Sequence, residues 1–149
     1  MLSRLNTQVL PQRPDYALMT GGVNDILLTG SYQQAQCAVM AFVHQCAHVK
    51  VRPVVGIPVP IRDDGENPWL PLTDMRRAMA AQREYTAWLR LFCSTMHLRC
   101  VDFAAAFEQC EKAKSLYLED GLHPNAAGHN LMAETVKNSG IWRGEVQRV

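Results

Sequence analysis

Short apolar segments that alternate with longer amphipathic segments constrain the fold of this 149-residue chain more than any other feature. Three apolar segments have the length of buried strands, and they lie at residues 15–21, 51–60 and 98–103. Apolar residues recur at helical spacing around them, in 2–10, 32–49, 74–96 and 126–138. Strands that are apolar on both faces and separated by helices predict a parallel sheet with helices on both sides. We therefore expect a single domain over residues 1–149 with a three-layer α/β/α fold.

The charge and hydropathy of the sequence give no support to several classes of partner. The 15 Lys and Arg residues nearly balance the 14 Asp and Glu residues, for a net charge of +1. This balance gives no electrostatic reason to expect a nucleic acid or an anionic membrane as partner. No apolar run approaches the roughly 18–20 residues needed to span a bilayer, and Met1 does not begin a signal peptide. We therefore expect a cytoplasmic protein.

The cysteines form no metal-binding pattern. Their number is odd, and no two are spaced as in C-x-x-C. We expect them to be small buried side chains in a reducing compartment, and we expect neither a metal nor an organic cofactor. The five cysteines are Cys37, Cys46, Cys93, Cys100 and Cys110.

The segment Asp120-Gly121-Leu122-His123-Pro124 holds a carboxylate and an imidazole three residues apart, in a loop that precedes a helix. A carboxylate at this spacing can accept the Nδ1–H of the imidazole and support the imidazolium that forms when Nε2 takes a proton. Such a pair can act as a general base. The same residues also fit an exposed turn without chemical function, so this motif alone leaves both interpretations open.

The segment Gly21-Gly22-Val23-Asn24-Asp25 directly follows the first apolar segment. Parallel sheets place their sites beyond the carboxyl ends of the strands, so this segment and the Asp120–His123 loop should meet there. Gly22 would let the backbone approach a ligand, Asn24 could donate to a developing oxyanion, and Asp25 could hold the turn. The alternative is a plain strand-ending turn, since glycine, asparagine and aspartate all favour turns.

Taken together, the two motifs and their order resemble the SGNH hydrolases, also called GDSL esterases and lipases. Gly22-Val23-Asn24-Asp25 matches the G-x-N-D block of that family, and Asp120-Gly121-Leu122-His123-Pro124 matches its D-x-x-H block with the common following proline. The resemblance covers most of the chain and implies a flavodoxin-like fold. It also implies that Asn24 is an oxyanion donor, that His123 is the general base, and that Asp120 orients it.

The sequence departs from this family at the nucleophile. The family carries its serine in a G-D-S motif at the end of its first strand, and no G-D-S occurs here. The segment at 2–10 is similar to the helix that follows the second block of the family. We therefore expect that the first two strands, the nucleophile and an oxyanion glycine lie upstream of Met1. The alternative is a nucleophile among the serines of the chain, which are Ser3, Ser31, Ser94, Ser115 and Ser139.

The resemblance implies hydrolysis of a small carboxylic ester by an acyl-enzyme route, with little or no activity from the chain by itself. An acyltransferase would use the same residues. The rival hypothesis is a non-catalytic protein that keeps the pocket and lacks the nucleophile, and that either binds an ester or a carbohydrate or serves as an interaction protein. The long loop at 58–73 is expected to contribute to substrate choice, and Trp69 in it fits either a substrate contact or a core contact.

The predicted strand at 15–21 also bears on whether the chain self-associates. In the flavodoxin-like strand order 2-1-3-4-5, a chain without strands 1 and 2 has this strand at the edge of its sheet. An apolar edge strand offers unpaired backbone groups to another chain. We therefore expect a homo-oligomer formed through residues 15–21.

Overall fold

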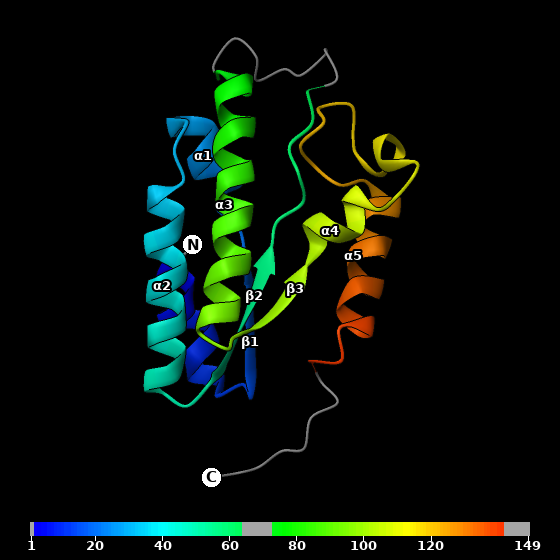
Figure 1. Cartoon of the computed structure of the whole chain (residues 1–149). Coiled ribbons are helices and arrows are strands. Elements are labelled where there is room, and N and C mark those ends of the chain that lie inside the picture. The colour runs from blue at the N-terminus through cyan, green and yellow to red at the C-terminus, as the bar shows by residue number, and fades with distance from the viewer. Residues whose placement is uncertain (1, 64–72, 142–149) are drawn as a thin grey trace.

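The computed structural model describes residues 2–63 and 73–141, and in this part of the chain three parallel strands form one sheet. In spatial order the strands are β1 (Tyr16–Thr20), β2 (Arg52–Ile57) and β3 (Arg99–Asp102). Leu18 of β1 lies opposite Val54 of β2. Because the strands are parallel, their carboxyl ends share one end of the sheet, the upper end in Figure 1.

Helices connect the strands and cover the sheet. The longer ones are α1 (Val23–Thr29), α2 (Gln33–His48), α3 (Met75–Thr95), α4 (Phe103–Glu108) and α5 (Ala126–Asn138). Short helical turns occur at Leu5–Val9, Leu10–Gln12 and Ala113–Leu116. The three predicted strands and the predicted helices α2, α3 and α5 are confirmed, with small shifts at their ends.

Helix α1 corrects the expectation that residues 22–25 form a loop. Gly22, with a φ of +100°, ends the extended backbone and becomes the N-cap of the helix. Ile26 is fully buried in the core between α2 and α3, and Val23 and Leu27 pack against the same core, so these apolar side chains anchor the seven-residue helix. The prediction failed because Gly, Asn and Asp favour both a turn and the first residues of a helix.

The sheet is the middle of three layers, as Figure 1 shows. Val55 and Ile57 of β2 belong to a core that includes Val39 of α2 and Leu89 of α3. The other face of the sheet packs against α5: Val54 and Val101 share a cluster with Met132 and Val136. The expected α/β/α architecture with a parallel sheet is therefore confirmed.

Strand β1 lies at an edge of the sheet, and in the described residues no strand pairs with its outer side. A groove of about 520 Å³ runs along it, with an apolar lining that includes Leu5, Val9, Leu18 and Phe42. Leu18 is 41% exposed there. In the helices that the structure describes, no stretch is both long and apolar enough to cross a membrane.

Candidate active site

The Asp120–His123 loop forms a closed turn around the Asp120 carboxylate. Oδ1 accepts the backbone N–H of Leu122 at 2.9 Å and that of His123 at 3.0 Å. Oδ2 lies 2.6 Å from Nδ1 of the His123 imidazole. Gly121 allows this path because its φ is +67°, and a Cβ there would lie 2.8 Å from the carbonyl oxygen of Arg62. The predicted contact between Asp120 and His123 is therefore present.

The two side chains differ in exposure. The Asp120 side chain is only 18% exposed, whereas the His123 side chain is 62% exposed. Burial opposes ionisation of Asp120, but the N–H groups of His123 and Leu122 and the His123 imidazole outweigh it, so the pKa of Asp120 lies below its ordinary value. The carboxylate is therefore ionised at neutral pH and holds Nδ1–H. The Nε2 edge of His123 makes no hydrogen bond within the described residues and is available to a reactant.

Asn125 fastens this loop to the start of α5. Its side-chain oxygen accepts the N–H groups of Ala127 and Gly128, which makes Asn125 the N-cap of the helix. Its amide NH2 donates to the carbonyl oxygens of Ser115 and Tyr117, at 2.8 and 2.9 Å. One side chain thus joins the helix, the His123 loop and the turn before it.

Gln82 is a positioning residue that the sequence analysis missed. It is 4% exposed in α3, and it accepts the N–H of Ile61 at 2.6 Å and donates to the carbonyl of Val59 at 2.7 Å. The next residue, Arg62, donates its N–H to the carbonyl of Gly121. Gln82 thereby fixes the segment after β2 that supports the His123 loop. A glutamine on the otherwise apolar side of a predicted helix was the available signal.

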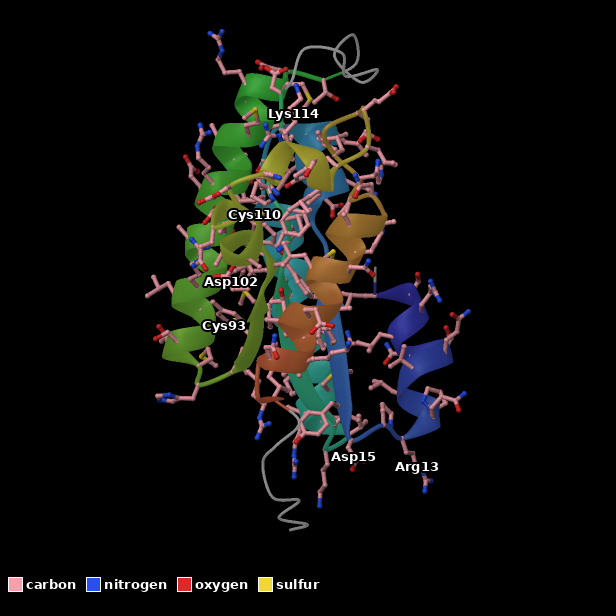
Figure 2. The ribbon with its side chains drawn as sticks, turned by 90° about the vertical axis from the view of Figure 1, so that its right-hand side faces the viewer. Arg13, Asp15, Cys93, Asp102, Cys110 and Lys114 are labelled. Carbon is pink, nitrogen blue, oxygen red and sulfur yellow. The ribbon has the colours of Figure 1, made fainter. Side chains whose placement is uncertain are left out.

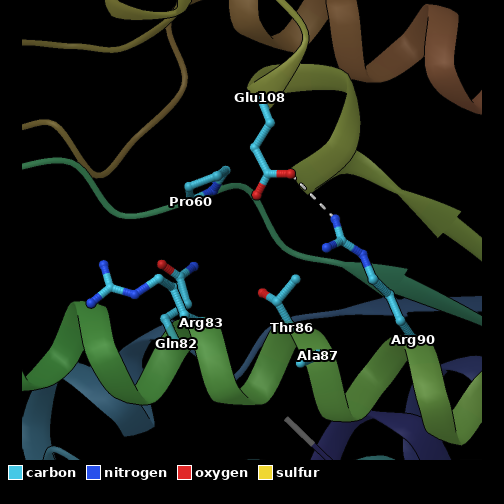
Figure 3. A pocket seen from close by; sticks show the side chains of 7 residues that line it. All are labelled: Pro60, Gln82, Arg83, Thr86, Ala87, Arg90 and Glu108. Carbon is cyan, nitrogen blue, oxygen red and sulfur yellow. Dashed lines mark hydrogen bonds and ion pairs between the residues drawn. The ribbon is translucent and has the colours of Figure 1, made fainter.

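The pocket beside Gln82 is separate from the predicted site residues. It holds about 250 Å³ between α3 and α4, and Figure 3 shows Gln82, Arg90 and Glu108 on its walls. Its lining includes neither His123 nor Asp120, so the pocket is distinct from the His123 loop. Trp69 and residues 64–72 of the predicted substrate loop lie outside the described residues.

The Gly22–Asp25 segment lies at the carboxyl end of β1. Gly22 is buried, and a Cβ on it would lie 2.7 Å from Ala35 and 2.9 Å from the Tyr85 ring. The lack of a side chain at Gly22 therefore lets the backbone pack closely against these two residues. Asn24 is exposed in the first turn of α1 and makes no side-chain hydrogen bond within the described residues. Burial and then the charge of Asp25 raise the pKa of Tyr85.

The structure thus brings the two predicted groups to one end of the sheet. Figure 1 shows α1 and the loop before α5 at the carboxyl ends of the strands, with the segment after β2 between them. Asp120 and His123 are in contact. Gly22, Asn24 and Asp25 make no hydrogen bond to His123, so their roles at the site stay predictions.

Three of the five serines make side-chain hydrogen bonds away from His123. Ser31 accepts the N–H of Gln33, while the hydroxyls of Ser115 and Ser139 donate to backbone carbonyls of their own turns. Within the residues that the structure describes, no serine hydroxyl is hydrogen-bonded to His123. In the same residues, no group of three or more His, Cys, Asp or Glu side chains could hold a metal ion.

Solved structures share this fold. The chain is similar to a GDSL-like lipase from Bacteroides thetaiotaomicron (20% identity, 91% of this chain, 66% of that chain, TM-score 0.72). It is also similar to a lipase/acylhydrolase from Enterococcus faecalis (21% identity, 99% and 72%, TM-score 0.74). A third similar structure is a catalytic mutant of an acetylxylan esterase from Geobacillus stearothermophilus (20% identity, 92% and 64%, TM-score 0.62). The chain spans about two thirds of the length of these proteins.

The sequence places the chain in a family. No curated protein matches it significantly. The GDSL-like lipase/acylhydrolase family matches residues 1–131, which include both predicted motifs. The fold, the paired Asp120 and His123, and this match over most of the sequence agree, and the chain belongs to the GDSL-like lipase/acylhydrolase family.

Proposed function

We propose that the chain carries the acid–base part of an ester hydrolase that works through an acyl-enzyme. The observation that carries this proposal is the 2.6 Å contact between Asp120 and Nδ1 of His123, with Nε2 turned to an exposed surface. A half-buried, ionised carboxylate fixes the imidazole as a base at Nε2 and stabilises the imidazolium that proton transfer creates. Family membership supports ester hydrolysis as the reaction.

Each residue has a defined part in the proposed reaction. A serine outside this sequence attacks the ester carbonyl, and Nε2 of His123 takes its proton. The NH2 of Asn24 donates to the oxyanion that forms, and the N–H of Gly22 is a second candidate donor. Asp25 places a negative charge in the first turn of α1, where it interacts favourably with the helix dipole. His123 then gives its proton to the leaving alcohol, and water releases the acyl group by the same steps.

A second candidate function is binding of an ester or a carbohydrate without turnover. The specific observation in its favour is that no described serine hydroxyl contacts His123, while the sequence has no G-D-S motif. In this case the exposed imidazole and the Asn24 amide would donate hydrogen bonds to the oxygens of a bound ligand.

The test is p-nitrophenyl acetate hydrolysis, measured on the chain and on the longest protein that its gene encodes in frame. We expect hydrolysis in the longer protein, with a loss of about 100-fold or more for His123→Ala. Asn24→Ala should lower kcat by about 100-fold with little change in KM. His129→Ala is the matched control, since this exposed histidine lies in the first turn of α5 and should leave the rate unchanged.

Two outcomes would count against the proposal. If neither protein hydrolyses the ester while a non-hydrolysable amide analogue still binds, the hydrolase proposal is overturned in favour of binding. A fluorophosphonate adduct on one of the five serines of the chain, lost in His123→Ala, would overturn the placement of the nucleophile outside this sequence. Peptide mapping of the labelled protein distinguishes these results.

A further inference from the structure

Two cysteine thiols meet where the end of α3 packs on β3. Arg90 and Cys93 lie one turn apart on α3, and Cys100 and Asp102 lie two residues apart on β3. Arg90 binds the Asp102 carboxylate at 2.8 Å, and the same register sets Cys93 of α3 beside Cys100 of β3, where each thiol is the largest influence on the pKa of the other. Figure 2 shows Cys93 and Asp102 on this side of the molecule. The pairs Arg90–Asp102 and Cys93–Cys100 therefore lie next to each other along the contact between α3 and β3.

The backbone fixes the same register. The N–H of Leu98 donates to the carbonyl of Cys93 at 2.9 Å, so the chain turns sharply at the end of α3 and returns along β3. His97 completes this turn with a φ of +51°. Arg90 also reaches Glu108 of α4, as Figure 3 shows. The thiol pair is thus held between elements that are already linked by ionic contacts.

The two thiols differ in access. Cys93 is buried, at 3% exposure, whereas Cys100 is exposed and lines an open groove of about 430 Å³ between β3 and α5. This exposure corrects the expectation that the cysteines are all buried, and Cys37 is exposed as well. A small reagent can therefore reach Cys100 directly, with Cys93 behind it.

The electrostatics of the pair favour Cys100 as the reactive thiol. The hydrogen bond from Cys93 lowers the pKa of Cys100 to about 7, although burial and the Asp102 charge oppose this shift. The other charged groups that face this position are Arg90 from α3 and Glu134, which lines the groove from α5. This lowered pKa favours the thiolate form of Cys100, which is the form that attacks a disulfide.

We infer that Cys93 and Cys100 form a reversible dithiol/disulfide site that exchanges with small disulfides such as oxidised glutathione. The Cys100 thiolate attacks one glutathione sulfur, the glutathione S–S bond breaks, and one glutathione leaves as its thiolate. Cys93 then loses its proton and attacks the sulfur of Cys100, which releases the second glutathione. In total, the two cysteine thiols lose two electrons and two protons and become a disulfide. One glutathione disulfide gains them and becomes two glutathione thiols. This site is independent of the proposed ester chemistry.

The test exposes the reduced chain to oxidised glutathione at pH 7, quenches with acid, and measures intact mass and linked peptides. The expected product is lighter by about 2 Da and yields a cross-linked peptide with Cys93 and Cys100. Closing this short loop should raise Tm by about 5 °C. Cys93→Ala should stop at the mixed disulfide on Cys100, heavier by about 305 Da, because the second thiol is absent.

Cys37 serves as the matched control, since it is exposed on α2 without a thiol partner in the described residues. Cys100→Ser should leave Cys93 unmodified, and this exposed substitution should not disturb the fold, as circular dichroism would show. In Cys93→Ala, alkylation of Cys100 should need a higher pH than in the unmodified chain. The inference is overturned if Cys93 and Cys100 stay reduced when Cys37 is fully modified, or if Cys100 links only to a second chain.

Discussion

Asp120 shows how a single residue can join the stability of the fold to its chemistry. Its carboxylate accepts two backbone N–H groups and contacts the His123 imidazole, so it organises the loop even without a substrate. The backbone bonds hold the loop closed, and the contact to Nδ1 leaves Nε2 as the only free ring nitrogen. A structural role and a chemical role therefore fall on the same side chain.

We predict that Asp120→Ala lowers the free energy of unfolding at pH 7 by about 1–3 kcal/mol, because two N–H groups lose their acceptor. The Asp120 pKa is depressed in the folded chain, so its stabilising contribution is present above the ordinary value of about 3.8 and is lost as pH falls through the lower folded value. Urea unfolding of both proteins at pH 7 and near pH 2 measures the difference. If the free energies of unfolding of the parent chain and of Asp120→Ala differ by the same amount at both pH values, the prediction is contradicted.

At the scale of elements, the junction of β1 and α1 depends on one position without a side chain. Gly22 has a φ of +100°, and a Cβ on it would lie 2.7 Å from Ala35 of α2 and 2.9 Å from Tyr85 of α3. The first turn of α1, with Asn24, is placed by this contact. The positive φ and the lack of space for a side chain thus both require a glycine where β1 meets α1.

We predict that Gly22→Ala lowers the free energy of unfolding by about 3 kcal/mol, since the new Cβ must overlap Ala35 and Tyr85 in a strained backbone. Gly140→Ala is the matched control. Gly140 also has a positive φ, of +68°, but a Cβ there would meet no described residue within 4 Å, so we expect a loss of only about 1 kcal/mol. Thermal unfolding of the two variants compares them directly, and equal losses would show that packing at Gly22 contributes nothing.

At the scale of the whole molecule, the position of β1 at an edge of the described sheet is the feature that bears on assembly. The backbone groups on the outer side of β1 have no strand partner in the described residues, and the groove beside it is apolar. A second copy of the chain can pair its own β1 edge across a two-fold axis and cover both grooves at once. We therefore propose that the chain by itself self-associates through β1.

We predict that the chain sediments as a dimer at micromolar concentration and that Leu18→Lys makes it a monomer, because a charge in the groove cannot be buried there. Leu91→Lys on α3 is the control: Leu91 is more exposed than Leu18, at 66%, and does not line the groove. Analytical ultracentrifugation of the three proteins gives the result. A monomeric parent chain, or a dimer that survives Leu18→Lys, would rule out this interface.

The sequence by itself determined the strands, the long helices and the Asp120–His123 pair. Strands and helices follow from local periodicity, and a carboxylate three residues before a histidine meets it within one turn of chain. Helix α1 escaped prediction because its residues favour a turn and a helix start alike, and only the burial of Ile26 decides between them.

Only the tertiary structure decided how distant residues support these local features. Gln82 meets Val59 and Ile61, Arg62 meets Gly121, and Cys93 meets Cys100, each after the chain has changed direction. Such contacts depend on which helix packs against which strand and in what register. That choice minimises the free energy of the whole core, so no local pattern in the sequence contains it.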